Sequence, residues 1–325
     1  QQEMSRALGA EHTSIRVTRA DICNAFPRTV RHTESPLVRT APTPLMLLSG
    51  HVREMGYKVV LTGEGADETF AGYDLFKEAK VRAFIARQPG SACRPRLLDR
   101  LYGYLENAPS KGALANAFFL QGLERANEPT FAHATRWATT QRIHRFFSPA
   151  VQDAIGTFDA EAAIAPHLPP GIAGWPALGR HQYLEAHTLM AGYLLSSQGD
   201  RVAMANSIEG RFPFLDHRLI EFANRLPPSR KLFGLREKYL LKKAAAPWLP
   251  EAIVRRTKQP YRAPDGTSFF SSGKPASYVA ELLSPASLAE AGLFEPAMAT
   301  RLVEKFAAGR AIGFADNMAF VAMLS

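Results

Sequence analysis

The fold is decided by one stretch of the chain, Tyr57-Lys58-Val59-Val60-Leu61-Thr62-Gly63-Glu64-Gly65-Ala66-Asp67-Glu68. Its first five residues are β-rich and apolar at the centre, which is typical of a strand buried on both faces of a parallel sheet. The two glycines that follow predict a tight turn, and the acidic residues after them suit the first turn of a helix. The stretch therefore predicts a strand, a turn and a helix in direct succession.

The residues upstream continue this alternation. Thr43 can cap a helix that begins at Pro44, and Gly56 stands where a left-handed residue commonly ends a helix. Apolar and polar residues alternate over residues 13–18, which predicts a further short strand. Strands and helices in alternation are the pattern of a doubly wound α/β sheet.

The chain beyond residue 79 offers almost no strand candidates and favours helical periodicity. Asp216, for example, is a good cap for a helix that runs on to Leu226. The predicted fold class is thus α/β, with a partial parallel sheet in residues 1–78 and a predominantly helical part in residues 79–325. The helical segments that we expect are residues 101–123, 184–206, 217–226 and 236–246 and the end of the chain.

Length and composition exclude several classes of protein. A chain of 325 residues allows two complete domains of about 150 residues each. The longest uncharged stretch, residues 162–179, is interrupted by prolines, so no membrane-spanning helix is expected. Cys23 and Cys93 are the only cysteines, too few for a disulfide framework. We expect a cytoplasmic protein with both thiols in its core.

The net charge of +9 invites a nucleic-acid interpretation. No aromatic RNA-binding signature and no zinc-finger spacing accompanies the basic residues, so we expect a solvated basic surface and neither a nucleic-acid nor a membrane partner. The densest basic positions are Lys238, Lys242, Lys243, Arg255, Arg256, Lys258 and Arg262.

The turn between the central strand and its helix is the candidate site. In open α/β sheets, ligands bind outside the carboxyl ends of the strands. A glycine-rich turn beside a helix N-terminus can hold an anion, and Asp67 could supply a carboxylate to a Mg²⁺ that also touches phosphate. Glu64 would point into the same cleft. On spacing alone, a merely structural turn fits equally well.

Three blocks of the sequence resemble the signatures of glutamine-dependent asparagine synthetases. The first is Val59 to Glu68, continued by Phe70-Ala71-Gly72-Tyr73, and it is similar to the family's second nucleotide-site motif. The second joins Asp200-Arg201-Val202-Ala203-Met204 to Glu209-Gly210-Arg211-Phe212-Pro213-Phe214-Leu215-Asp216. The third, Arg256-Thr257-Lys258-Gln259-Pro260-Tyr261, resembles the family's lysine-bearing loop. The resemblance covers nearly the whole chain.

This resemblance implies an ATP-pyrophosphatase (adenine nucleotide alpha hydrolase-like) fold and a carbon–nitrogen ligase. Such enzymes use ATP and Mg²⁺ to convert aspartate into a β-aspartyl-adenylate with release of pyrophosphate. Ammonia from glutamine then displaces AMP and gives asparagine. The implied partners are these small molecules and an N-terminal glutaminase domain of the parent chain; a homodimer stays open.

The family's site residues carry over onto matching positions of this chain. By this resemblance, Asp67 would ligate Mg²⁺. Glu64 would act on the activated carboxylate and the incoming amine as a base or an orienting group, and Lys258 would stabilise charge on the phosphate and the tetrahedral intermediate. The residues that would contact the nucleotide are Thr62, Gly63, Glu64 and Gly65.

Further charged residues stand outside the turn. We expect the charged residues of the second block to form a buried ion-pair and capping network beneath the site, because charges among apolar neighbours need partners. These are Asp200, Arg201, Glu209, Arg211 and Asp216. Arg39 falls roughly where the family binds aspartate, but its register is off by about a residue, so no role is assigned to it.

Parts of the family pattern are missing. The nucleophilic cysteine of the glutaminase half has no counterpart, and the Ser-Gly-Gly-x-Asp-Ser pyrophosphate loop should lie upstream of residue 1. We therefore expect a fragment of a synthetase domain that makes no asparagine by itself.

Three alternatives remain open. A β-lactam synthetase or a peptide-tailoring amide ligase would use the same adenylation, although the lactam-forming enzymes carry a tyrosine where this chain has Glu64. A truncated, non-catalytic binding module would fit the missing loop. A basic nucleic-acid binder would show a salt-dependent affinity.

Overall fold

A short parallel sheet joins the first and second blocks of sequence that resemble the family signatures. The computed structural model describes residues 1–102, 118–310 and 313–325. In it, β1 (Val59–Leu61) pairs with β2 (Glu209–Arg211), with Val60 opposite Gly210. The strand expected over residues 57–61 is therefore confirmed, but β2 lies in the part expected to be helical. β2 consists of a glycine between two charged residues, and such a short segment shows no alternation of apolar and polar residues. It can therefore be recognised only from its pairing with β1.

Helices make up most of the remaining described residues. Before residue 100 lie α1 (Gln2–Leu8), α2 (Arg19–Thr33), α3 (Pro42–Glu54), α4 (Ala66–Phe70) and α5 (Asp74–Ala86). The middle of the chain holds α7 (Ala134–Gln141), α8 (Pro149–Ile155), α9 (Ala160–Ile164), α10 (Ala177–Glu185), the π-helical η6 (Ala186–Leu194) and η7 (Ser196–Asp200), and α11 (Arg201–Met204). Then follow α12 (His217–Arg225), α13 (Pro228–Lys231), α14 (Tyr239–Ala245), α15 (Glu251–Arg255), β3 (Phe270–Ser271), β4 (Lys274–Pro275), α16 (Ser277–Leu282), α17 (Pro285–Ala291), α18 (Pro296–Ala307) and α19 (Phe314–Leu324).

Short 3-10 helices connect these elements. They are η1 (Arg94–Arg100), η2 (Leu123–Arg125), η3 (Arg142–Phe146), η4 (Ala165–His167), η5 (Ile172–Gly174), η8 (Pro213–Leu215), η9 (Ala246–Trp248) and η10 (Gly266–Phe269). β3 and β4 pair in antiparallel fashion. The helix expected over residues 101–123 falls largely outside the described residues.

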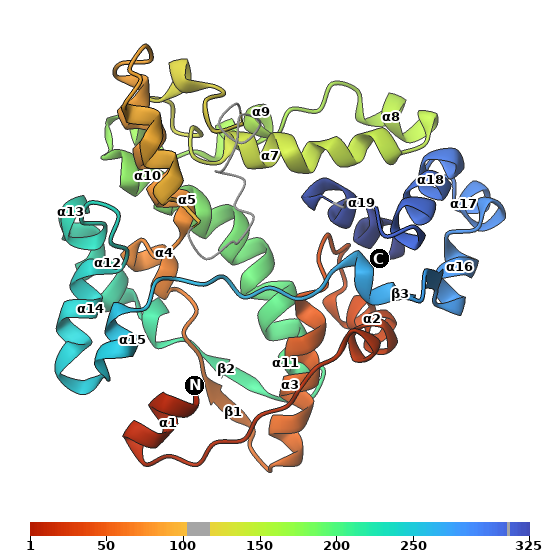
Figure 1. Cartoon of the computed structure of the whole chain (residues 1–325), viewed down its shortest axis with the longest axis horizontal. Helices are drawn as coiled ribbons and strands as arrows, with labels where there is room; N and C mark the ends of the chain where they lie inside the picture. The colour runs from red at the N-terminus through yellow and green to blue at the C-terminus, as the bar shows by residue number, and fades with distance from the viewer. Residues whose placement is uncertain (103–117, 311–312) are drawn as a thin grey trace.

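The helices gather around several hydrophobic clusters. The largest packs α2 against the C-terminal helices, with Phe26, Phe269, Phe306 and Phe320 among its buried rings. A smaller cluster joins Leu75 and neighbouring residues of α5 to the chain around α13. Between these groups, the run of helix from α10 through η6 and η7 to α11 crosses the molecule diagonally (Figure 1).

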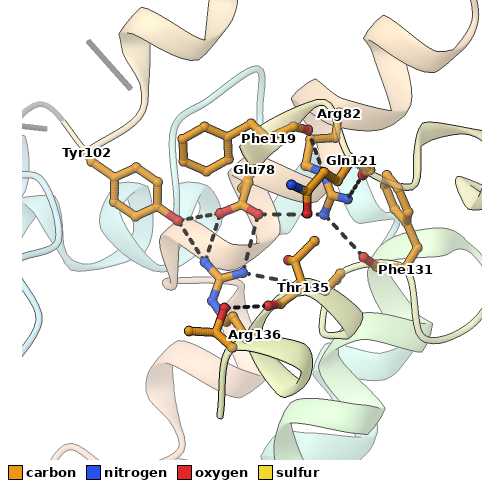
Figure 2. A network of polar contacts seen from close by, with 10 residues as sticks. Glu78, Arg82, Tyr102, Phe119, Gln121, Phe131, Thr135 and Arg136 are labelled. Carbon is orange, nitrogen blue, oxygen red and sulfur yellow. Dashed lines mark hydrogen bonds and ion pairs between the residues drawn. The ribbon is translucent and has the colours of Figure 1, made fainter. Parts of the chain in front are cut away.

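A buried ionic network fixes α5 to the chain on either side of the undescribed residues 103–117. The Glu78 carboxylate accepts hydrogen bonds from Arg136 at 2.8 Å and from the Tyr102 hydroxyl at 2.5 Å. Arg82 lies 3.7 Å from Glu78, and both side chains are only 1% exposed. Figure 2 shows the Arg82 guanidinium pointing away from Arg136 toward backbone carbonyls, which belong to Phe119, Gln121 and Phe131.

Three local expectations need correction. Residues 13–18 form no strand; Thr18 instead caps α2, and its hydroxyl accepts a hydrogen bond from the Asp21 backbone. The third helix begins at Pro42 rather than Pro44, although Gly56 is left-handed (φ 86°) as expected. Cys93 is exposed, whereas Cys23 is buried as predicted.

The burial predicted for β1 is also wrong. Val59 is 48% exposed and Leu61 77% exposed. These residues alternate along the strand and so share one face of the sheet. A strand is buried on both faces only when helices cover both, and β1 pairs only with β2 in the described part of the chain. One face of this small sheet is therefore open.

Candidate active site

The turn after β1 depends on its second glycine. Gly65 has φ 89°, in the left-handed region that favours glycine, and it caps the N-terminus of α4. A Cβ atom at this position would overlap the side chain of Leu215. Gly63, in contrast, faces open space, because a Cβ there would meet nothing within 4 Å. The backbone of the turn thus leaves room for a ligand in front of Gly63.

The two side chains beside these glycines have unpaired polar atoms. Thr62 Oγ1 and Glu64 Oε2 are buried, and neither has a hydrogen-bond partner among the described residues. A buried polar atom without a partner costs about 1–3 kcal/mol, so native proteins rarely keep one without a reason. The two unpaired atoms are therefore candidates for polar contacts with a ligand at the turn.

Asp67 lies in the first turn of α4 and binds two lysines. Its Oδ1 atom accepts a hydrogen bond from Lys238 Nζ at 2.8 Å, and its Oδ2 atom accepts one from Lys258 Nζ at 2.6 Å. Burial by itself would raise the pKa of Asp67, but the charges and hydrogen bonds of the two lysines lower this pKa below its ordinary value. The carboxylate stays ionised, and the three side chains together carry one surplus positive charge.

Gly72 and Tyr73 shape the surroundings of this triad. A Cβ atom at Gly72 would overlap the Asp67 carboxylate, so only glycine permits this close approach. The ring centroid of Tyr73 lies 5.5 Å from Lys258 Nζ, which is a cation–π distance. The Tyr73 hydroxyl in turn donates to the buried Glu68 at 2.8 Å. The Lys258 ammonium therefore interacts with both a carboxylate and an aromatic ring.

Lys258 belongs to an extended segment, residues 256–265, which we call the strap. The strap has no regular secondary structure and runs from the end of α15 toward β3 (Figure 1). Its far half is bound to the start of α3, because the Tyr261 hydroxyl donates to the Ala41 carbonyl at 3.2 Å and Thr40 donates to the Pro264 carbonyl at 2.9 Å. The strap thus connects the start of α3 with Asp67.

The structure brings together two of the site residues predicted from sequence. Asp67 and Lys258 are 191 positions apart and form a direct ion pair. Lys238 is the third member, and sequence reasoning missed it because it stands in a run of ordinary basic residues. Its backbone φ of 49° lies in the left-handed region, which non-glycine residues rarely adopt outside strained or functional positions. Nothing in the local sequence signals that conformation.

The prediction that the charged residues of the second block form a buried ion-pair network is wrong. Glu209 and Arg211 form an ion pair at 2.7 Å, but their side chains are 55% and 61% exposed. Asp216 caps α12 as expected, Asp200 is exposed, and Arg201 donates to a backbone carbonyl of α2. The charged side chains of β2 face solvent because they lie on an open face of the sheet.

Arg39 lies near the far end of the strap. Its guanidinium is 4.0 Å from Asp265 and 5.6 Å from the ring centroid of Phe314. Arg39 does not contact Asp67, and its role stays unassigned.

The described residues do not fit Mg²⁺ by themselves. Mg²⁺ takes carboxylate oxygens together with water or phosphate, but each oxygen of Asp67 accepts a hydrogen bond from an ammonium group. Within the described ranges, no three His, Cys, Asp or Glu residues gather where they could hold a metal ion. Magnesium binding by Asp67 therefore stays a prediction.

Comparison with known proteins now decides the family. The family model for asparagine synthases matches residues 1–325. The chain belongs to the asparagine synthase family.

The chain is similar both to proteins named asparagine synthetase and to one named amidase. Amidase chyE of Penicillium rubens is 28% identical over 326 residues, which cover 92% of this chain and 45% of that protein. Asparagine synthetase 1 (glutamine-hydrolyzing) of Bacillus subtilis is 29% identical over 265 residues, 81% of this chain and 39% of that protein. Asparagine synthetase B of Escherichia coli is 40% identical over 80 residues, 24% of this chain and 14% of that protein. The chain thus spans less than half the length of these relatives.

No helix among the described residues is long and apolar enough to cross a bilayer.

Proposed function

We propose that the chain is the synthetase part of a carbon–nitrogen ligase that makes asparagine. In this proposal, ATP activates the side-chain carboxylate of aspartate as an adenylate, and ammonia from glutamine displaces AMP. The observation that carries the proposal is the meeting of Asp67, Lys238 and Lys258 beyond the carboxyl end of β1. Membership of the asparagine synthase family supports it.

The two lysines would supply charge stabilisation. Adenylate formation and its displacement both develop negative charge on phosphate and carbonyl oxygens, and fixed cations at those oxygens lower the barrier. Asp67 already orients the ammonium groups of Lys258 and Lys238, and the two lysine side chains are 20% and 21% exposed, so neither is sealed in the core. Lys258 would stabilise the phosphate and the tetrahedral intermediate, with Lys238 as a second cation.

The turn would bind the nucleotide. Gly63 leaves space, Gly65 makes the close turn, and the unpaired Thr62 Oγ1 and Glu64 Oε2 atoms supply polar contacts. Glu64 would also act on the incoming amine, either as a base that accepts a proton from it or as a group that orients it. No step of this proposal passes through Mg²⁺, because the described residues alone do not form a metal site.

The decisive experiment measures AMP and pyrophosphate release by the protein in its natural full length, with aspartate, ATP and ammonia. Lys258→Ala should lower kcat by about 10²-fold or more, as expected for loss of a charge that stabilises the transition state. Lys243→Ala is the matched control, because Lys243 is exposed and its one interaction within the described part of the chain is with the ring of Tyr239, whose centroid lies 5.0 Å from Nζ. Absence of aspartate-dependent turnover in the wild type would refute the proposal.

A second candidate is amide formation on another carboxylic acid. It is favoured by one observation: the amidase chyE covers 92% of this chain, more than the two synthetases do. A β-lactam-forming or peptide-tailoring enzyme is a form of this candidate. Turnover with ATP and a different acid, in a panel where aspartate is inactive, would select it; a chain that binds nucleotide without turnover would instead be a non-catalytic module.

The remaining parts of the proposal concern the whole enzyme. We infer an ATP-pyrophosphatase fold divided into residues 1–78 and 79–325, a glutaminase domain in the parent chain and a cytoplasmic location. The length of the chain, less than half that of its relatives, is consistent with such a parent. Sedimentation of the full-length protein would test the homodimer.

A further inference from the structure

We propose that Glu237 is a positioning residue, which fixes the backbone of the strap and thereby aims Lys258 at Asp67. Its importance for chemistry rests on the proposed function of Lys258, whereas its effect on the strap does not. Glu237 immediately precedes Lys238 at the start of α14 and is 2% exposed. It does not contact Asp67 in the structure, so its effect would be indirect.

The carboxylate of Glu237 binds three donors from three parts of the chain. Its Oε1 atom accepts hydrogen bonds from Lys242 Nζ at 2.8 Å and from the Lys258 backbone N–H at 3.1 Å. Its Oε2 atom lies 2.8 Å from Lys77 Nζ on α5. One buried side chain therefore links α5, α14 and the strap.

Lys242 adds a second anchor on the strap. Its ammonium group donates to Glu237 and also to the Arg256 carbonyl, at 2.8 Å. Arg256 and Lys258 are thus held through a carbonyl and an N–H, with one residue between them. An extended segment has no helix or sheet to satisfy its backbone groups, so such side-chain contacts decide where it lies. The two contacts fix the backbone from which the Lys258 side chain extends.

The cluster is balanced in charge. Lys77 also pairs with Asp74 at 3.0 Å, so two carboxylates meet two ammonium groups. Burial by itself would raise the pKa of Glu237, but the hydrogen bonds from Lys242 and Lys77 lower it to about 2. The anchor is therefore ionised at neutral pH. A neutral side chain at this position would leave Lys77 and Lys242 with too little negative charge.

The test compares Glu237→Gln with Glu251→Gln by hydrogen exchange. Glu251 is the matched control, because it is 73% exposed and pairs with Arg255 on the surface next to the strap. Glu237→Gln should speed exchange of the strap amides, that of Lys258 included, by about tenfold or more, while α18 and α19 keep wild-type protection. Lys242→Met, which removes the second anchor at a less buried position, should give the same local change.

Kinetics of the full-length protein then connect the anchor to the site. Glu237→Gln should lower kcat with little change in the KM for aspartate, because the substrate still binds while Lys258 is misplaced. Unchanged strap exchange in both Glu237→Gln and Lys242→Met would overturn the proposal, as would faster exchange with wild-type kcat. Wild-type activity of Lys258→Ala would refute the proposed function instead, and the exchange result would stand.

Discussion

At the scale of single residues, Gly72 is the residue that lets the Asp67 carboxylate lie where it does. Gly72→Ala would force a methyl group into that carboxylate. We expect a loss of about 1–3 kcal/mol of stability, typical of overpacking, together with weaker pairing of Asp67 with the lysines. Urea denaturation measures the loss, with Gly90→Ala as the control, because a Cβ at Gly90 meets nothing within 4 Å. Equal stability of both variants would contradict the geometry.

Asp67 makes the stability of the fold depend on pH. Because the two lysines lower its pKa below 3.8, its ionised form stabilises the folded state. That contribution is complete above the ordinary pKa and is lost as the pH falls below 3.8 through the folded-state value. Asp67→Asn should therefore be less stable at pH 7, and its free energy of unfolding should fall less steeply below about pH 4. Parallel curves for wild type and variant from pH 6 to 2.5 would refute this.

At the scale of elements, the ionic network on α5 fixes the helix that follows the motif. Glu78→Gln removes the carboxylate that faces Arg82 and Arg136, and Arg82 is 1% exposed. We expect a cost of about 3–5 kcal/mol, because a buried charge loses its partner. The control is Glu221→Gln, whose surface pair with Arg225 spans 3.8 Å and should matter by less than about 0.5 kcal/mol. Chemical denaturation that finds the two variants alike would show that the network is not buried in solution.

At the scale of the whole molecule, the open face of β1 tests whether further chain covers the sheet. Leu61 is 77% exposed, so Leu61→Ser should change the stability of this 325-residue chain by less than about 0.5 kcal/mol. If an additional layer of an ATP-pyrophosphatase sheet covers this face in the full-length protein, the same substitution there should cost about 2 kcal/mol or more. A small effect in both forms would argue against that fold.

The structure shows where some of the positive charges of the chain are used. A net charge of +9 resembles that of a nucleic-acid binder. Four of the lysines, however, pair with Asp67 or Glu237, where they hold the strap and the candidate site. Position, rather than number, decides what these charges do.

The sequence by itself determined the local pieces. The strand and turn after Tyr57, the left-handed Gly56 and the Asp216 cap were predictable, because each depends on residues within about one turn of chain. The three motif blocks also indicated the family, and they placed Asp67 and Lys258 in one site, although not as an ion pair.

Only the tertiary structure decided how distant segments meet. The pairing of β1 with β2, the arrival of Lys238 beside Asp67 and the anchoring of the strap by Glu237 depend on packing between segments far apart in the chain. Periodicity and capping are local signals, so they cannot tell a site lysine from a solvated one. The exposure of Leu61 could not be predicted from the sequence either, because the burial of a strand depends on the segments that cover it and not on the strand's own residues.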